Sequence, residues 1–96
     1  MLRHVVLLKF RENYSLEVLK DITEQLDSMM DKVPNILSFT HGPDAGATPV
    51  AFDYGVVADF ASKEDLLAYL GHPAHKAMGG NVMKIVAEAV PIQFYC

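Results

Sequence analysis

The sequence predicts one α+β domain over residues 1–96, with its elements in the order strand, helix, strand, strand, helix, strand. Two observations support this order. Short apolar segments rich in β-branched or aromatic residues lie near the start, the middle and the end of the chain, as is typical of strands. After the first of them, apolar residues recur at three- and four-residue spacing, as on one face of a helix. The order is that of a ferredoxin-like βαββαβ domain with a four-stranded antiparallel sheet and helices on one face.

The first half of the chain opens with residues 2–10, LRHVVLLKF, which indicate a strand that is apolar on both faces. From Leu16 to Val33 the apolar residues follow helical spacing. Ser15 is the natural N-cap of this helix, and Pro34 stops it. A second strand is expected over about residues 36–41.

The middle of the chain contains a loop and a strand before the second helical region. Residues 44–51 include glycine and proline and predict a loop between strands rather than a domain linker. Residues 52–60 alternate two sets of side chains and predict the third strand. Ser62 caps a helix that runs to about Leu70 and ends at Gly71.

The last third of the chain is again divided by proline and glycine. Pro73 can start a short helical turn, which the Gly79-Gly80 pair is expected to break. A final helix is expected from Asn81 to about residue 87, and residues 89–95 predict the last strand.

Charged residues indicate how the strands pair. In this topology the first and third strands are central neighbours, and the last is an edge strand, where Pro91 is tolerated. A register in which paired residue numbers sum to 62 places Arg3 opposite Asp59 and Lys9 opposite Asp53, with both pairs on one face.

The same register pairs Val5 with Val57 and leaves them, with Leu7, on the face opposite His4. If the helices cover the face of His4, the three aliphatic side chains lie on a helix-free face. Leaving them in water would forgo about 1.5–3 kcal/mol for each side chain. We therefore expect a second copy of the chain to cover this face, which predicts a homodimer.

Composition and charge exclude several classes of function. The net charge is −4 and no basic cluster occurs, so neither nucleic acid nor an anionic membrane surface is an expected partner. The apolar run at residues 5–8 is too short for a membrane span or an export signal. The single cysteine, Cys96, cannot form an internal disulfide. We expect a cytoplasmic protein.

The candidate chemistry lies around two histidines and a tyrosine. Tyr69 precedes His72 by three residues, and His75 follows in the segment His-Pro-Ala-His. Two imidazoles and a phenol thus gather at the end of a helix, where His4 of the first strand could meet them as part of a general acid–base site. The alternative interpretation is structural: His4 is a hydrogen-bonded, partly buried histidine, Tyr69 is a core ring, and His72 turns the chain.

No metal or organic cofactor is expected. Pro73 prevents His72 and His75 from sharing one helix face, and no HExxH spacing occurs. The sequence also contains no GxGxxG, P-loop or GxSxG pattern.

Four segments together resemble the stress-responsive dimeric α/β-barrel (Dabb) family over nearly the whole chain. They are RHVVLLKF with His4, the Gly42 turn, the stretch from Phe60 to His75 that ends in HPAH, and the terminal PIQFY. The resemblance implies a ferredoxin-like protomer whose helix-free sheet face packs on a second protomer, which gives a dimeric α/β barrel. It also implies a small cavity between sheet and helices into which His4, Tyr69 and His75 point.

Catalytic relatives that resemble this chain include plant polyketide cyclases, which close an aromatic ring by aldol condensation without a metal or an organic cofactor. By position, His75 would be the general acid–base, Tyr69 would hold it or the substrate oxygen, and His4 would be a second polar contact. A further tyrosine of the cyclases is replaced by Leu26. The residues expected to bind the ligand are Val6, Leu8, Leu26, Val56, Ala58, Leu66, Leu70 and Met78.

Two functions follow from this reasoning. The first is binding of a small apolar or aromatic molecule, with cofactor-independent acid–base chemistry by the histidines and the tyrosine. The alternative is a non-catalytic, stress-associated protein that acts through a stable dimer or a larger assembly. The related dimeric monooxygenases gain no support, because no residue pattern points to a haem site or an oxygen substrate.

Overall fold

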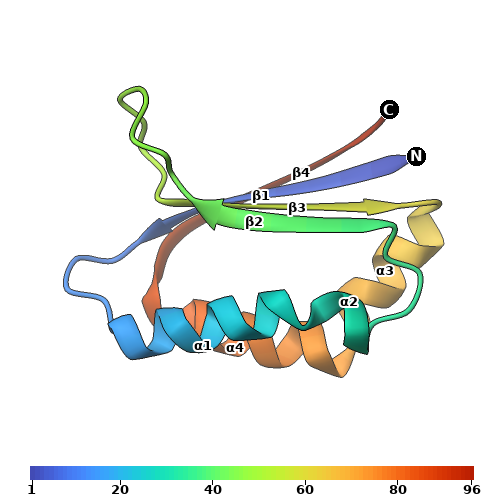
Figure 1. Cartoon of the computed structure of the whole chain (residues 1–96), viewed down its shortest axis with the longest axis horizontal. Helices are drawn as coiled ribbons and strands as arrows, with labels where there is room; N and C mark the ends of the chain where they lie inside the picture. Colours follow the sequence, from blue (N-terminus) through green and yellow to red (C-terminus); the bar gives the residue numbers. More distant parts are fainter.

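The computed structural model describes all 96 residues and confirms the ferredoxin-like order, with each helical region divided into two helices (Figure 1). The strands form one antiparallel sheet in the order β2-β3-β1-β4. All four helices lie on one face of this sheet. The elements are β1 (Leu2–Phe10), α1 (Leu16–Asp27), α2 (Met29–Lys32), β2 (Ser38–Pro43), β3 (Tyr54–Phe60), α3 (Lys63–Gly71), α4 (Pro73–Ile85) and β4 (Val86–Tyr95).

The predicted register between β1 and β3 is confirmed by the pairs Arg3 with Asp59 and Val5 with Val57. The guanidinium of Arg3 donates two hydrogen bonds to the Asp59 carboxylate, from Nε at 2.8 Å and from Nη2 at 3.1 Å. Ser38 of β2 donates a third, at 2.6 Å. The carboxylate thus ties together the three strands that pair around it.

The second predicted charge pair, Lys9 with Asp53, is not formed. Pairing of β1 with β3 ends at Leu8 and Tyr54, so Asp53 lies beyond the strand. Its carboxylate instead accepts a hydrogen bond from the backbone N–H of Phe10, at 2.8 Å. The partner of the Asp53 carboxylate is therefore a backbone N–H at the end of the strand rather than the ammonium group of Lys9.

The predicted helix from Leu16 to Val33 is divided at Ser28. Ser15 caps its start as expected, with Oγ accepting a hydrogen bond from the N–H of Val18. At the break, the Ser28 hydroxyl donates to the carbonyl of Gln25, at 3.0 Å. The apolar face nevertheless continues across the break, because Ile22, Leu26, Met29 and Val33 are all buried.

The expected break at Gly79-Gly80, and a separate helix from Asn81, are wrong. α4 is continuous and packs along α1 (Figure 1). Glycine in a helix interior costs only about 1 kcal/mol relative to alanine, an amount that packing between helices exceeds. Asn81 does not cap a helix: its amide donates to the side chain of Gln25 on α1, at 2.9 Å. None of the helices is long and apolar enough to cross a bilayer.

Four strand boundaries, in three strands, differ from those expected. β2 begins and ends two residues later than predicted, and β3 begins two residues later. β4 begins at Val86, three residues earlier than predicted. Backbone hydrogen bonding to β1 decides this start, since Phe10 pairs with Val86 across a register shift.

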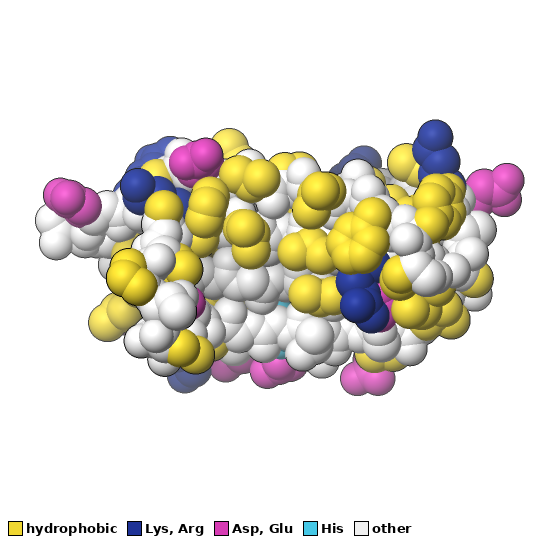
Figure 2. Space-filling model, turned by 90° about the horizontal axis from the view of Figure 1, so that it is seen from above, with side chains coloured by type: hydrophobic (Ala, Val, Ile, Leu, Met, Phe, Trp, Pro, Cys, Tyr) yellow, Lys and Arg dark blue, Asp and Glu magenta, His cyan; other side chains and the backbone are white.

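The two faces of the sheet differ as predicted. His4, Leu8 and Ala58 are buried beneath the helices. On the helix-free face, β4 adds apolar residues beside those of β1 and β3. Figure 2 looks onto this face and shows hydrophobic side chains gathered across it. The large apolar side chains exposed there include Leu7, Val90, Ile92 and Phe94.

Candidate functional site

A cavity of about 130 Å³ lies between the sheet and the helices, on the helix-covered face. It brings together His4 of β1, Tyr69 of α3 and His75 of α4, the three residues that the sequence selected. Apolar side chains form most of the remaining wall. The lining residues are His4, Val6, Leu8, Leu26, Val56, Tyr69, His75, Met78, Gly79, Val82 and Ala89.

The junction of α3 and α4 positions two of the three polar residues. α3 ends at Gly71 and α4 begins at Pro73, so a single residue, His72, separates the helices. His72 caps α4, with Nδ1 accepting a hydrogen bond from the N–H of Ala74 at 3.0 Å. His72 therefore has a structural role at the junction of α3 and α4.

The Tyr69 ring contacts both cavity histidines. Its centroid lies 4.6 Å from that of His75 and 6.3 Å from that of His4, and both contacts are edge-to-face. This packing fixes the two imidazoles around one phenol ring.

Tyr69 lines the cavity, and its phenol remains protonated. Burial raises the pKa of Tyr69 to about 12. Every buried side-chain nitrogen and oxygen atom has a hydrogen-bond partner in the chain. The Tyr69 hydroxyl makes no hydrogen bond within the chain, so it is not fully enclosed and is free to donate to a bound molecule.

Both cavity histidines are neutral at pH 7. Burial lowers the pKa of His4, and the nearby His75 lowers it further. Burial also lowers the pKa of His75, opposed by a hydrogen bond with the backbone of Leu70. Neutral imidazoles can accept a proton, which is what a general base requires.

Gln93 of β4 is a polar neighbour of the site that the sequence analysis missed. Its amide nitrogen lies 2.8 Å from Nδ1 of His4. Because the amide donates, Nδ1 is the acceptor, and the single proton of the neutral imidazole is on Nε2. The signal for this contact was the register of β4 on β1, which places Gln93 directly opposite His4.

The predicted wall residues divide into two groups. Val6, Leu8, Leu26, Val56 and Met78 line the cavity. Ala58 and Leu66 lie in the core beside it, and Leu70 packs against that core without reaching the cavity.

Three wall residues, Gly79, Val82 and Ala89, were missed. Two of them belong to α4, in which the Gly79-Gly80 pair predicted a break. A continuous α4 instead lays these residues along the cavity.

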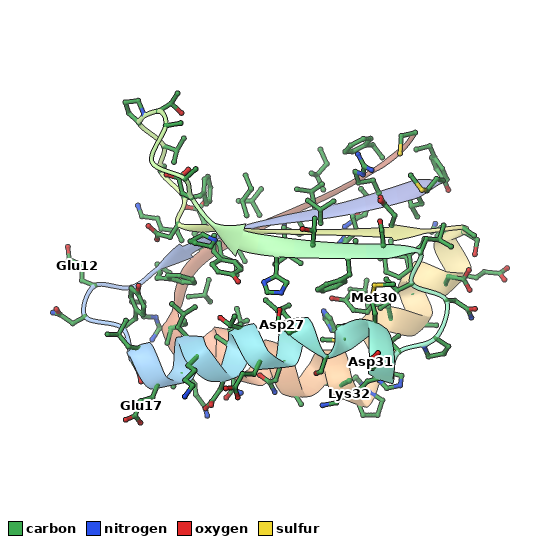
Figure 3. All side chains as sticks on the ribbon, in the orientation of Figure 1. Glu12, Glu17, Asp27, Met30, Asp31 and Lys32 are labelled. Atoms are coloured by element: carbon green, nitrogen blue, oxygen red, sulfur yellow. The ribbon has the colours of Figure 1, made fainter.

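A second polar cluster joins α1, β2 and β3 outside this cavity. His41 lies 2.7 Å from the Tyr54 hydroxyl through Nδ1 and 2.7 Å from the Asp27 carboxylate through Nε2. Figure 3 shows Asp27 at the end of α1, beneath the sheet. No spacing in the sequence indicated a role for His41.

The cavity thus combines neutral bases and a protonated phenol with apolar walls. Such a set can hold a small apolar molecule and move a proton on it. The chain contains no group of three or more histidine, cysteine, aspartate or glutamate side chains that could hold a metal ion.

Comparisons with known proteins agree with the fold. A stress-response A/B barrel domain-containing protein of Arabidopsis thaliana is 21% identical over 95 residues, which cover 96% of this chain and 83% of that protein. The crystal structure of a dimeric ferredoxin-like protein of unknown function from Thermobifida fusca has a TM-score of 0.89 at 24% identity, covering 99% of this chain and 90% of that one. The hydroxynitrile lyase of Passiflora edulis has a TM-score of 0.83 at 16% identity, covering 97% and 90%.

The family described as the stress responsive A/B barrel domain matches residues 2–96. The match spans all four strands, all four helices and every lining residue of the cavity. It confirms the resemblance found in the sequence. The chain belongs to the stress responsive A/B barrel domain (Dabb) family.

Proposed function

We propose that this protein binds a small, ring-sized, largely apolar molecule in the cavity between its sheet and its helices and performs proton-transfer chemistry on it. The observation that carries the proposal is the cavity itself: His4, Tyr69 and His75 are its titratable side chains, set in an apolar wall. Ligand sites typically combine apolar walls with a few convergent polar groups in this way.

The volume of the cavity sets the size of the ligand. An apolar protein cavity of about 150 Å³ holds a benzene molecule, and this cavity measures about 130 Å³. Leu26 occupies part of the wall where the cyclase relatives carry a tyrosine. The wall therefore favours a monocyclic compound over an extended polyketide chain.

The protonation states assign the roles. Neutral His75 would remove a proton from a carbon next to a carbonyl group, and the Tyr69 phenol would donate a hydrogen bond to the oxygen on which charge develops. The imidazolium of His75 would then return the proton to another atom of the same molecule. His4, oriented by Gln93, would offer its Nε2 proton as a second donor. A chain of similar fold is a hydroxynitrile lyase, which supports an enzymatic use of this architecture.

Calorimetric titration with phenol tests the binding step. Phenol matches the cavity in size and carries one hydroxyl for the polar wall. We expect His75→Ala to weaken binding by about tenfold, the equivalent of one hydrogen bond to a buried group, and to leave the fold unchanged. A matched control is Lys76→Ala, which alters the exposed neighbour. If wild type binds phenol no better than His75→Ala does, the site is not the one proposed.

The exposed helix-free face supports the second function, assembly. Solved neighbours of this fold are dimeric, and the apolar side chains of Ile92 and Phe94 are 57% and 45% exposed on the helix-free face. We propose a homodimer through this face, as the sequence predicted. Ile92→Lys should give a monomer in sedimentation velocity, whereas Leu67→Lys, at an equally exposed position on α3, should remain dimeric. A dimeric Ile92→Lys variant would contradict this interface.

A further inference from the structure

A larger cavity lies under the loop that joins β2 to β3. Its volume is about 670 Å³, and it shares no lining residue with the cavity of His4, Tyr69 and His75. Its walls come from the end of β1, from Leu19 and Thr23 of α1, from the start of β3 and from the loop itself. It is therefore a separate site.

Aromatic rings form one side of this cavity. Phe10 and Tyr14 have ring centroids 4.9 Å apart and inclined by 53°, and Phe10 and Tyr54 are 6.2 Å apart and inclined by 41°. Phe52 adds a fourth ring to the wall. Aromatic rings that line a cavity can attract an organic cation through their faces.

The Tyr54 ring is held in place from behind. Its hydroxyl is bonded to His41, whose ring stacks on that of Tyr54 at 6.0 Å and 22°. His41 is bonded in turn to Asp27. Burial raises the pKa of Tyr54, so its phenol carries no charge. A fixed, uncharged ring loses little conformational freedom when a ligand binds.

The charged side chains of the wall are both acidic. Asp44 and Asp53 line the cavity, and no lysine or arginine does. Each carboxylate is fixed by one backbone donor: Asp44 accepts from Gly46 at 2.9 Å and Asp53 from Phe10 at 2.8 Å. Neither forms an ion pair, because the ion pairs of the chain join Arg3 to Asp59 and His41 to Asp27. The wall thus presents two uncompensated negative charges beside four rings.

We infer that this cavity binds an organic cation of the quaternary-ammonium class. A metal ion fits less well, because calcium takes six to eight oxygen ligands and the wall supplies two carboxylates. Aromatic faces favour a weakly hydrated cation over a compact one, since such a cation loses little hydration when it leaves water. The carboxylates add charge complementarity, consistent with the net charge of −4.

Calorimetric titration of the full chain with choline and with 3,3-dimethylbutan-1-ol tests the inference. The two probes have the same shape and differ in the charge of the central atom. We expect choline to bind at least about tenfold more tightly than the alcohol, as a cation between rings should. Equal binding of the two probes would show an apolar cleft without cation selectivity and would overturn the inference, as would the absence of choline binding.

Variants locate the site. Asp44→Asn with Asp53→Asn should weaken choline binding about tenfold and leave the alcohol unchanged, because the amide oxygens still accept the two backbone bonds. Asp31→Asn is the matched control, on α2 at the opposite end of the molecule from the loop (Figure 3). Tyr14→Leu removes one ring without altering a charge and should also weaken choline binding. If Asp31→Asn weakens choline binding as much as the double variant does, the effect comes from the overall charge of the protein, and this result would contradict the site.

His75→Ala should leave choline binding intact, which separates this inference from the proposed function.

Discussion

The imidazole of His75 lies edge-on to the ring of Tyr69, with ring centroids 4.6 Å apart. The two residues belong to different helices, α3 and α4, which are separated by His72 alone. The geometry of the pair therefore depends on how this short junction is held. The hydrogen bond that caps α4 is part of that support.

His72→Ala should destabilise the protein by about 0.5–2 kcal/mol, the usual cost of removing an N-cap acceptor. The reason is that the N–H of Ala74 loses its partner, Nδ1 of His72. Urea denaturation measures the change. His72→Asn restores a capping side chain and should recover most of the stability. Equal stability of wild type and His72→Ala would mean that the cap does not stabilise the junction.

Gly79→Leu should block the cavity between sheet and helices. Gly79 lines this cavity, and a Cβ added there meets no heavy atom within 4 Å. The new side chain can therefore enter the space that a ligand would occupy. We expect phenol binding to be lost in calorimetry while the circular dichroism spectrum is unchanged.

Gly80→Leu is the matched control for this change. Gly80 is the exposed neighbour, does not line the cavity and has equal room for a side chain. The Gly80→Leu variant should bind phenol as wild type does. Because a helical glycine is replaced, the free energy of unfolding of the variant should also be higher by about 0.5–1 kcal/mol. Loss of phenol binding in both variants would place the ligand elsewhere.

The buried histidines predict a pH dependence of stability. His4 and His75 have pKa values below their ordinary value of 6.5 in the folded chain, so the unfolded chain binds protons more readily. The free energy of unfolding should be highest above pH 6.5 and should fall as the pH decreases below it. Chemical denaturation between pH 8 and pH 5 measures the slope. His75→Gln should reduce this slope, and an unchanged slope would contradict the assignment.

Asp59 should make the free energy of unfolding depend on pH in a second, more acidic range. The hydrogen bonds from Arg3 and then Ser38 lower its pKa below the ordinary value of 3.8. Its contribution to stability is therefore present above pH 3.8 and is lost as the pH falls through the folded-state pKa. Asp59→Asn should destabilise the chain at pH 7 and weaken its pH dependence below pH 4. Asp21→Asn, at an exposed position on α1, should do neither.

Much of the fold could be predicted because local patterns and tertiary packing agree. The pairing of Arg3 with Asp59 is an example: opposite charges lie at the positions that the strand periodicity also places face to face. The helix N-caps at Ser15 and Ser62 were correct for the same reason, since capping depends on neighbouring residues alone.

The errors arose where tertiary contacts outweigh local preference. Gly79 and Gly80 would weaken an isolated helix, but α4 is stabilised along its length by α1. Gln93 escaped notice because its partner, His4, is 89 residues away in sequence and the register of the edge strand was not predicted. Asp27, His41 and Tyr54 meet only once three elements are assembled, so no spacing in the sequence indicates them.

Intermolecular nuclear Overhauser effects between phenol and the isotopically labelled protein test the central claim most directly. We expect contacts from the phenol ring protons to the methyl groups of Val56 and Met78 and to the ring of Tyr69, which surround one cavity. Contacts to Val90 and Ile92 on the helix-free face instead, or no contacts at saturating phenol, would contradict it.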